Sequence, residues 1–115
     1  MKKIAIPVKN GKLSEYFGKC NHYEIFDIYD KNIVRNTVEV PSKDTLEKIN
    51  IWASNQGITD IIVYKIDNKY IQLFSNFKIN LFIGISRDTP QNLIQNYIDG
   101  KLKSDTTIIS QIRNK

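Results

Sequence analysis

Three short segments of the chain are apolar at nearly every position. They are residues 3–8, 60–64 and 79–85. A strand is apolar throughout only when both of its faces are covered, so we expect these segments to be the central strands of a sheet with helices on its faces. Pro7 cannot donate a backbone hydrogen bond, and we therefore place it near the end of the first strand.

Two more strands are expected before the first helix. Residues 23–30 are rich in apolar and aromatic side chains, and residues 33–40 carry valines with a period of two. Residues 30–32 between them suit a tight hairpin turn. We expect the strand over 23–30 to run antiparallel to the first strand. Residues 9–22 show no helical period and are expected to form an ordered loop.

Three helices are expected, over residues 43–56, 68–76 and 90–99, because apolar residues recur there at helical spacing. In the first of them Trp52 shares the apolar face, so we expect this side chain to be substantially buried. The last fifteen residues are expected to form a loose tail or a short edge strand around 107–109. The residues expected to cap the three helices are Ser42 and Gly57, then Asp67, then Thr89 and Gly100.

This order of elements, β, β, β, α, β, α, β, α, predicts an α/β fold with a mixed sheet of five strands. The central strands are expected to be parallel, because helices connect them. We expect Tyr23–Asp30 to lie beside the first strand, as one arm of the hairpin that precedes the βαβαβ unit. We see no linker, internal repeat or low-complexity segment that would divide the chain.

Composition limits the setting and the function. A chain of 115 residues fits one domain, and no apolar run approaches the ~20 residues of a membrane span. The short apolar stretch at the start does not suit a signal peptide. One cysteine cannot form a disulfide within a single copy, so we expect a cytoplasmic location. The net charge is +5, with the basic residues concentrated at the two ends; solvated lysines are the simpler explanation.

Five segments, in order, resemble the dinitrogenase iron–molybdenum cofactor family over roughly residues 2–103. The resemblance implies a ribonuclease-H-like, three-layer α/β/α fold, with a domain over 1–103 and a tail over 104–115. It also implies a non-enzymatic protein that binds or carries an iron–molybdenum or iron–sulfur cluster during cofactor assembly, with a protein partner. The five segments are Met1–Val8, Ser14–Cys20, Tyr23–Tyr29, Leu81–Gly84 and Tyr97–Leu102.

The segment over residues 14–20 resembles the family's signature loop, and it contains the candidate ligands. A thiolate and an imidazole suit metal–sulfur clusters, which makes Cys20 and His22 the candidate metal ligands. Two ligands do not complete a cluster site, which typically takes four. Beside them, Tyr16 and Phe17 are expected to form the wall of a pocket.

Basic side chains are expected to help hold such a ligand. Lys19 would offset the negative charge of a cluster, and Lys9 and Lys12 could surround an anion in the same loop. Lys65 follows a central strand, and ligands of open α/β sheets gather beyond the carboxyl ends of the strands. We also expect Lys19 to lower the pKa of the neighbouring Cys20 thiol.

Three departures from the family pattern support an alternative. Tyr16 stands where the family usually has His, and two glycine-rich turns are replaced, one by residues 41–43 and one by residues 64–67. The alternative is a divergent member that has lost the cluster, holds no cofactor and acts through protein–protein contacts. A nuclease is not expected, because the first strand carries no carboxylate for a two-metal site. Scattered lysines predict only weak, salt-sensitive nucleic-acid binding.

Overall fold

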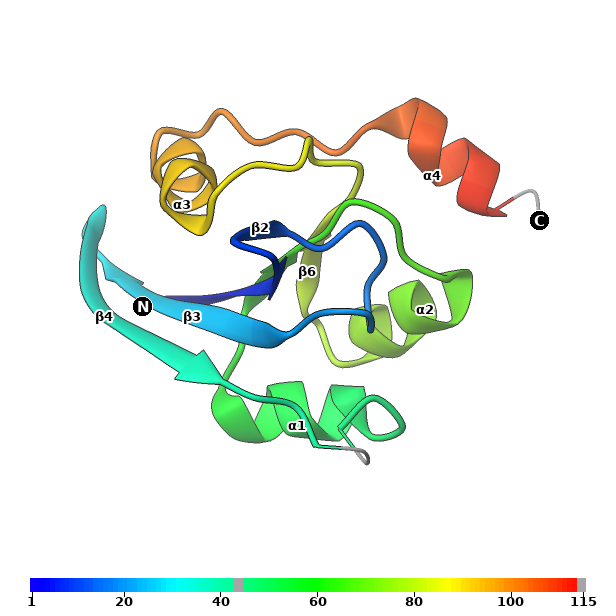
Figure 1. Cartoon of the computed structure of the whole chain (residues 1–115), viewed down its shortest axis with the longest axis horizontal. Coiled ribbons are helices and arrows are strands. Elements are labelled where there is room, and N and C mark those ends of the chain that lie inside the picture. Colours follow the sequence, from blue (N-terminus) through cyan, green and yellow to red (C-terminus); the bar gives the residue numbers. More distant parts are fainter. Residues whose placement is uncertain (43–44, 114–115) are drawn as a thin grey trace.

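A computed structural model describes residues 1–42 and 45–113 of the chain. Within these ranges the chain forms a mixed α/β fold (Figure 1). The strands are β1 (Lys2–Lys9), β2 (Lys12–Leu13), β3 (His22–Tyr29), β4 (Asn32–Glu39), β5 (Asp60–Ile62) and β6 (Asn80–Phe82). The helices are α1 (Ile49–Gln56), α2 (Asn68–Asn76), α3 (Pro90–Ile98) and α4 (Thr106–Arg113).

The main sheet has the order β4-β3-β1-β5-β6. The β3 and β4 strands are antiparallel to their neighbours, whereas β1, β5 and β6 are parallel to one another. The five expected strands and the antiparallel pairing of β3 with β1 are thereby confirmed. The sixth strand, β2, lies inside the segment expected to be a loop and pairs with β1. Asn10 and Gly11 adopt φ angles of 55° and 81°, the left-handed conformation that lets so short a hairpin close.

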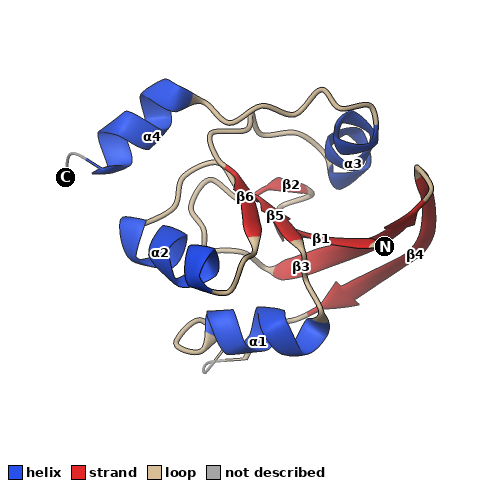
Figure 2. Ribbon diagram, turned by 180° about the vertical axis from the view of Figure 1, so that it is seen from behind, coloured by secondary structure: helices blue, strands red, loops and turns tan. Residues whose placement is uncertain are grey.

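The sheet separates two hydrophobic cores. The α1 and α2 helices cover one face and α3 covers the other, as Figures 1 and 2 show from opposite sides. Alternation along β1 explains this division, because Ile4 and Ile6 enter the α3 core whereas Ala5 enters the α1–α2 core. The strand is therefore apolar on both faces, as its sequence predicts.

The helix positions agree with the sequence except in the first helix. The α2 helix spans the predicted residues, and Thr89 caps α3 by accepting a hydrogen bond from the Asn92 backbone N–H at 3.3 Å. The α1 helix begins at Ile49, so Ser42 is not its cap. Ser42 instead bonds through both its backbone N–H and its hydroxyl to the Thr45 hydroxyl, a local turn that competes with helix formation. The predicted helix residues 43–44 lie outside the described ranges.

Trp52 is only half-buried, on the side of α1 that faces β3. Its ring lies 4.8 Å from that of Tyr23, measured between centroids. The substantial burial expected for Trp52 is therefore realised only in part. At the start of α2, Asp67 occupies the expected N-cap position, but its side chain makes no capping hydrogen bond.

The C-terminal segment forms a helix, so the expected short edge strand is wrong. Asp105 begins α4, since its carboxylate accepts hydrogen bonds from the backbone N–H groups of Thr107 and Ile108 at 2.9 and 3.3 Å. The three isoleucines of α4 pack against the core on the α1–α2 side of the sheet; they are Ile108, Ile109 and Ile112. Their spacing fits one helical face, which explains why a β-branched run folds as a helix here.

Over the described ranges, no helix has the length and apolar character that crossing a membrane requires.

Candidate functional site

The signature loop lies at the carboxyl ends of the parallel strands. The β1, β5 and β6 strands point the same way, so the segments that leave them meet at one edge of the sheet. Residues 14–21 return along this edge from β2 to β3, beside the segment that follows β5. This arrangement brings Lys65 and the signature loop together, although Lys65 lies 44 positions after the last residue of the loop.

Backbone hydrogen bonds hold the loop in place. The Phe17 N–H donates to the Lys65 carbonyl at 2.8 Å, and the Lys65 N–H donates to the Glu15 carbonyl at 3.1 Å. The buried Ser14 hydroxyl donates to the Tyr16 carbonyl at 2.9 Å. Gly18 has a φ of 98°, which an L side chain rarely adopts, and it turns the chain after these contacts. The loop is therefore a fixed platform whose backbone is largely satisfied.

Phe17 anchors this platform in the core. Its ring lies 5.3 Å from Tyr70 and 5.7 Å from Phe74 between centroids, and both pairs are edge-on. The side chain is 7% exposed. The neighbours of Phe17 are thus core aromatics, and its side chain fixes the loop.

Tyr16, in contrast, points to the outside and is 50% exposed. The Lys65 Nζ lies 5.3 Å from the centre of the Tyr16 ring and 5.4 Å from that of Tyr64. A lysine ammonium between two aromatic rings is attracted to both and keeps its charge near the loop. Tyr16 and Lys65, both predicted to belong to the site, are in contact.

An open hollow of about 280 Å³ lies on the outer side of the loop. Three of its side chains are cationic, from Lys9, Lys19 and Arg87, and one is a carboxylate, from Glu15. The excess of positive charge suits an anionic ligand. The full lining is Lys9, Asn10, Ser14, Glu15, Tyr16, Lys19 and Arg87.

Cys20 does not face this hollow. It is half-buried and packs against the core on the α1–α2 side of the sheet. Burial raises the pKa of the Cys20 thiol, and a hydrogen bond with Tyr23 offsets only part of that rise. The expectation that Lys19 lowers this pKa is therefore wrong. Burial raises the pKa of Tyr23 above its usual range, and the neighbouring Cys20 thiol adds to this rise.

His22 lies apart from Cys20. It is the first residue of β3, and strand alternation places its side chain on the sheet face opposite to that of Tyr23. The thiol of Cys20 contacts Tyr23, so the two candidate ligands are on different faces. Within residues 1–42 and 45–113, no group of three or more His, Cys, Asp or Glu side chains is arranged to hold a metal ion.

Arg87 is the main residue of the hollow that the sequence did not indicate. Its Nε donates to the Leu13 carbonyl at 2.8 Å, which ties the segment after β6 to β2. The same strand-end argument that selected Lys65 after β5 would have selected Arg87 after β6. The Leu13 N–H also donates to the Asp88 carbonyl at 2.9 Å, so both segments are held side by side.

Several known proteins are similar to this chain in sequence or in structure. An uncharacterized protein of Methanocaldococcus jannaschii is 27% identical over 106 residues, which are 88% of this chain and 89% of that protein. A crystal structure of a protein named PH0822 superposes with a TM-score of 0.81 at 22% identity, covering 90% of this chain and 94% of the other. The apo orange protein of Desulfovibrio gigas gives a TM-score of 0.75 at 14% identity, covering 91% and 93%.

At these identities the two structures are similar to this chain in fold alone. The sequence also matches a family model, which identifies the family of the chain. Residues 1–100 fit the family described as dinitrogenase iron–molybdenum cofactor. That range includes the whole sheet, the signature loop and helices α1 to α3. The chain belongs to the dinitrogenase iron–molybdenum cofactor family.

Proposed function

We propose that this protein is a non-enzymatic binding or carrier protein for an anionic iron–molybdenum or iron–sulfur cluster in cofactor assembly. The observation that carries the proposal is the hollow beside the signature loop, where Lys9, Lys19 and Arg87 outnumber Glu15. Family membership supports the identity of the cargo. We assign the fold to the ribonuclease-H-like α/β/α class, which the helices on both sheet faces support.

The chemistry of the hollow suits a cluster that keeps its own ligands. Metal–sulfur clusters fixed by a protein typically take four thiolate or imidazole ligands. The hollow contains neither Cys20 nor His22, and burial keeps the pKa of the Cys20 thiol raised. Ligation by a full set of side chains does not fit these residues. Attraction between cationic side chains and an anionic cargo does fit them, and it permits the release that a carrier needs.

Tyr16 and Lys65 would form the outer wall against such a cargo. The exposed ring of Tyr16 lines the hollow, and the Lys65 Nζ lies 5.3 Å from the centre of that ring. The backbone contacts between the loop and Lys65 hold this wall in position without the cargo. A preformed wall reduces the conformational entropy lost on binding.

The cytoplasm, which keeps a single cysteine reduced, is the location we propose for this carrier. A partner protein that supplies or receives the cluster completes the proposal. The alternative, a divergent member that acts through protein contacts alone, is favoured by one observation. The β4 strand carries several exposed apolar side chains, such as Val34 and Val38, which are 54% and 58% exposed.

The proposal can be tested by anaerobic titration with isolated iron–molybdenum cofactor. Wild-type protein should take up one cluster per chain, and binding should weaken as salt screens the cationic side chains. The Lys9→Gln/Lys19→Gln variant should bind about tenfold more weakly, a loss of about 1.4 kcal/mol. The matched control is Lys31→Gln/Lys78→Gln, which removes the same charge from exposed positions outside the hollow. No uptake by wild type, or equal losses in both variants, would contradict the proposal.

A further inference from the structure

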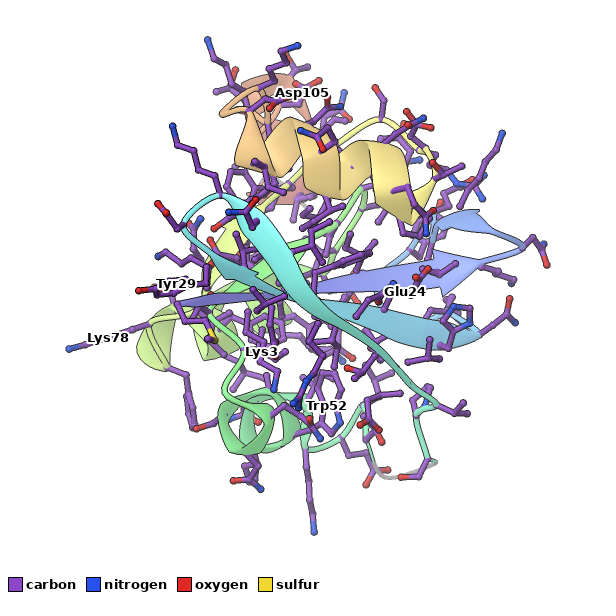
Figure 3. The ribbon with its side chains drawn as sticks, turned by 90° about the vertical axis from the view of Figure 1, so that its left-hand side faces the viewer. Lys3, Glu24, Tyr29, Trp52, Lys78 and Asp105 are labelled. Carbon is purple, nitrogen blue, oxygen red and sulfur yellow. The ribbon has the colours of Figure 1, made fainter. Side chains whose placement is uncertain are left out.

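The outermost strand, β4, is exposed on both of its faces. All of its residues are exposed except Glu39, whereas each of the central strands is buried. It pairs with β3 on one side, and its other side is an edge of the sheet. Figure 3 looks onto this edge, and β4 crosses the front between the helices above and below. No helix covers the strand in that view.

Such an edge offers backbone N–H and C=O groups to another strand. Proteins commonly protect edges with proline, with several charges or with a short strand. The β4 strand has eight residues, contains no proline and carries two charged side chains, Arg35 and Glu39. Its register with β3 shifts at Val34, so the regular part of this edge is residues 35–39, centred on Thr37. Exposed apolar side chains accompany them, and Ile33 is 45% exposed. The strand therefore has the length and character of a pairing surface.

The two charged residues are arranged symmetrically about Thr37. Arg35 lies two residues before Thr37, and Glu39 lies two residues after it. On β3 the partners of these residues are Asp27, Ile25 and Tyr23. Residues at alternate positions share a face, so Arg35, Thr37 and Glu39 lie on the same side of the sheet.

We propose that β4 pairs antiparallel with β4 of a second copy of this chain, about a two-fold axis through Thr37. In that register Arg35 of each copy lies opposite Glu39 of the other, giving two cross-strand charge pairs. Asn36 of each copy lies opposite Val38 of the other. The two sheets become one continuous sheet with an isologous interface. This proposal is independent of the cluster hollow, whose lining residues do not include β4.

Other registers lose this complementarity. With the axis through Asn36, Arg35 faces Thr37 and Glu39 faces Ile33, so neither charge has a partner. With the axis through Arg35, the two arginines face each other and repel, and Glu39 meets only Lys31, which lies in the turn outside β4. The charge pattern thus selects the register as well as the occupant, because a strand of another protein would not have to repeat this symmetry.

Sedimentation equilibrium of the full chain, with charge reversal, tests the proposal. Wild type should dimerise, and Arg35→Glu and Glu39→Arg should each weaken the dimer about tenfold or more, since each turns both charge pairs into repulsions. The double variant Arg35→Glu/Glu39→Arg restores two opposite-charge pairs and should restore the dimer. Lys31→Glu, in the adjoining turn, changes the net charge as Arg35→Glu does and should dimerise as wild type.

The substituted side chains are largely exposed, so the variants should keep the fold, and circular dichroism checks this. A wild-type chain that stays monomeric from micromolar to millimolar concentration would overturn the proposal. So would a double variant that dimerises no better than the two single variants. An Arg35→Glu dimer as strong as that of Lys31→Glu would overturn it as well.

Discussion

Cys20 shows how one side chain can be suited to the family chemistry by type but not by environment. A thiolate is a strong ligand for iron, and the thiol must lose its proton to become one. Burial against the core raises the pKa of Cys20, and the hydrogen bond with Tyr23 lowers it only in part. The thiol therefore acts as a protonated packing group against the core, next to Tyr23.

The rate at which Cys20 reacts with iodoacetamide should reveal this raised pKa. In urea the pH profile should have its midpoint near 9.0, the ordinary thiol value, and in the native protein the midpoint should be higher. Stability follows the same shift: the contribution from the protonated thiol is complete below pH 9.0 and is lost as pH rises through the folded-state pKa. Tyr23→Phe removes the hydrogen bond and should raise the native midpoint further. A native midpoint at or below 9.0 would contradict the environment described for Cys20.

Tyr16 is the position where this chain departs from the signature loop of its family. It is exposed and lines the hollow, so an imidazole in its place would face the cargo. Tyr16→His should therefore bind isolated iron–molybdenum cofactor severalfold more tightly than wild type, because it adds a ligand that clusters accept. Tyr29→His, on an exposed tyrosine of β3, is the control and should leave the affinity unchanged. Equal affinities for both variants and the wild type would show that position 16 does not contact the cluster.

At the scale of elements, the C-terminal segment depends on a glycine in the segment that follows β6. Gly84 has a φ of 80°, and a Cβ placed on it would lie 2.5 Å from the Cβ of Asp105. The backbone there is also tied to the segment, since the Asp105 N–H donates to the Ile83 carbonyl at 2.7 Å. The approach of α4 to the sheet therefore requires the absence of a side chain at position 84.

Gly84→Ala should destabilise the protein by about 1–3 kcal/mol, because it combines a left-handed backbone with a collision. Gly100→Ala provides the control, since its φ is 70° and nothing lies within 4 Å of the added Cβ. The free energy of unfolding in urea should fall further for Gly84→Ala than for Gly100→Ala. Limited proteolysis should cleave the segment around α4 faster in the first variant alone. Equal losses of stability would show that the contact with Asp105 contributes nothing.

The elements that sequence patterns predict well are those with one dominant signal. Fully apolar runs identify β1, β5 and β6, and spacing with capping residues identifies α2 and α3. The α4 helix was missed because Thr107 to Ile109 is a β-branched run, which favours a strand when Ile112 is left out of the pattern. The start of α1 was misplaced because a serine forms local turns as readily as caps.

The candidate site was predictable where strand ends determine it and not where side-chain direction does. The carboxyl-end rule correctly brought Lys65 to the signature loop. The pairing of Cys20 with His22 rests on residue type and on short separation in sequence, and neither determines the direction of a side chain. The β3 strand begins at His22, so Cys20 lies in the preceding loop and turns towards the core.

At the scale of the molecule, the proposed functions use two separate parts of one sheet. The hollow uses the carboxyl ends of its parallel strands, which meet the signature loop. The proposed dimer uses the lateral edge, β4, whose pairing leaves that end open. Helices cover both faces of the central strands, whereas β4 is exposed at the lateral edge (Figure 2).

We propose that charge, and not ligation by Cys20, holds the cluster. The most direct measurement is the dissociation constant of isolated iron–molybdenum cofactor, determined anaerobically and side by side for Cys20→Ser and for Lys9→Gln/Lys19→Gln. Cys20→Ser should stay within about twofold of wild type, whereas the lysine variant should bind about tenfold more weakly. Loss of binding in Cys20→Ser, with binding kept in the lysine variant, would contradict it.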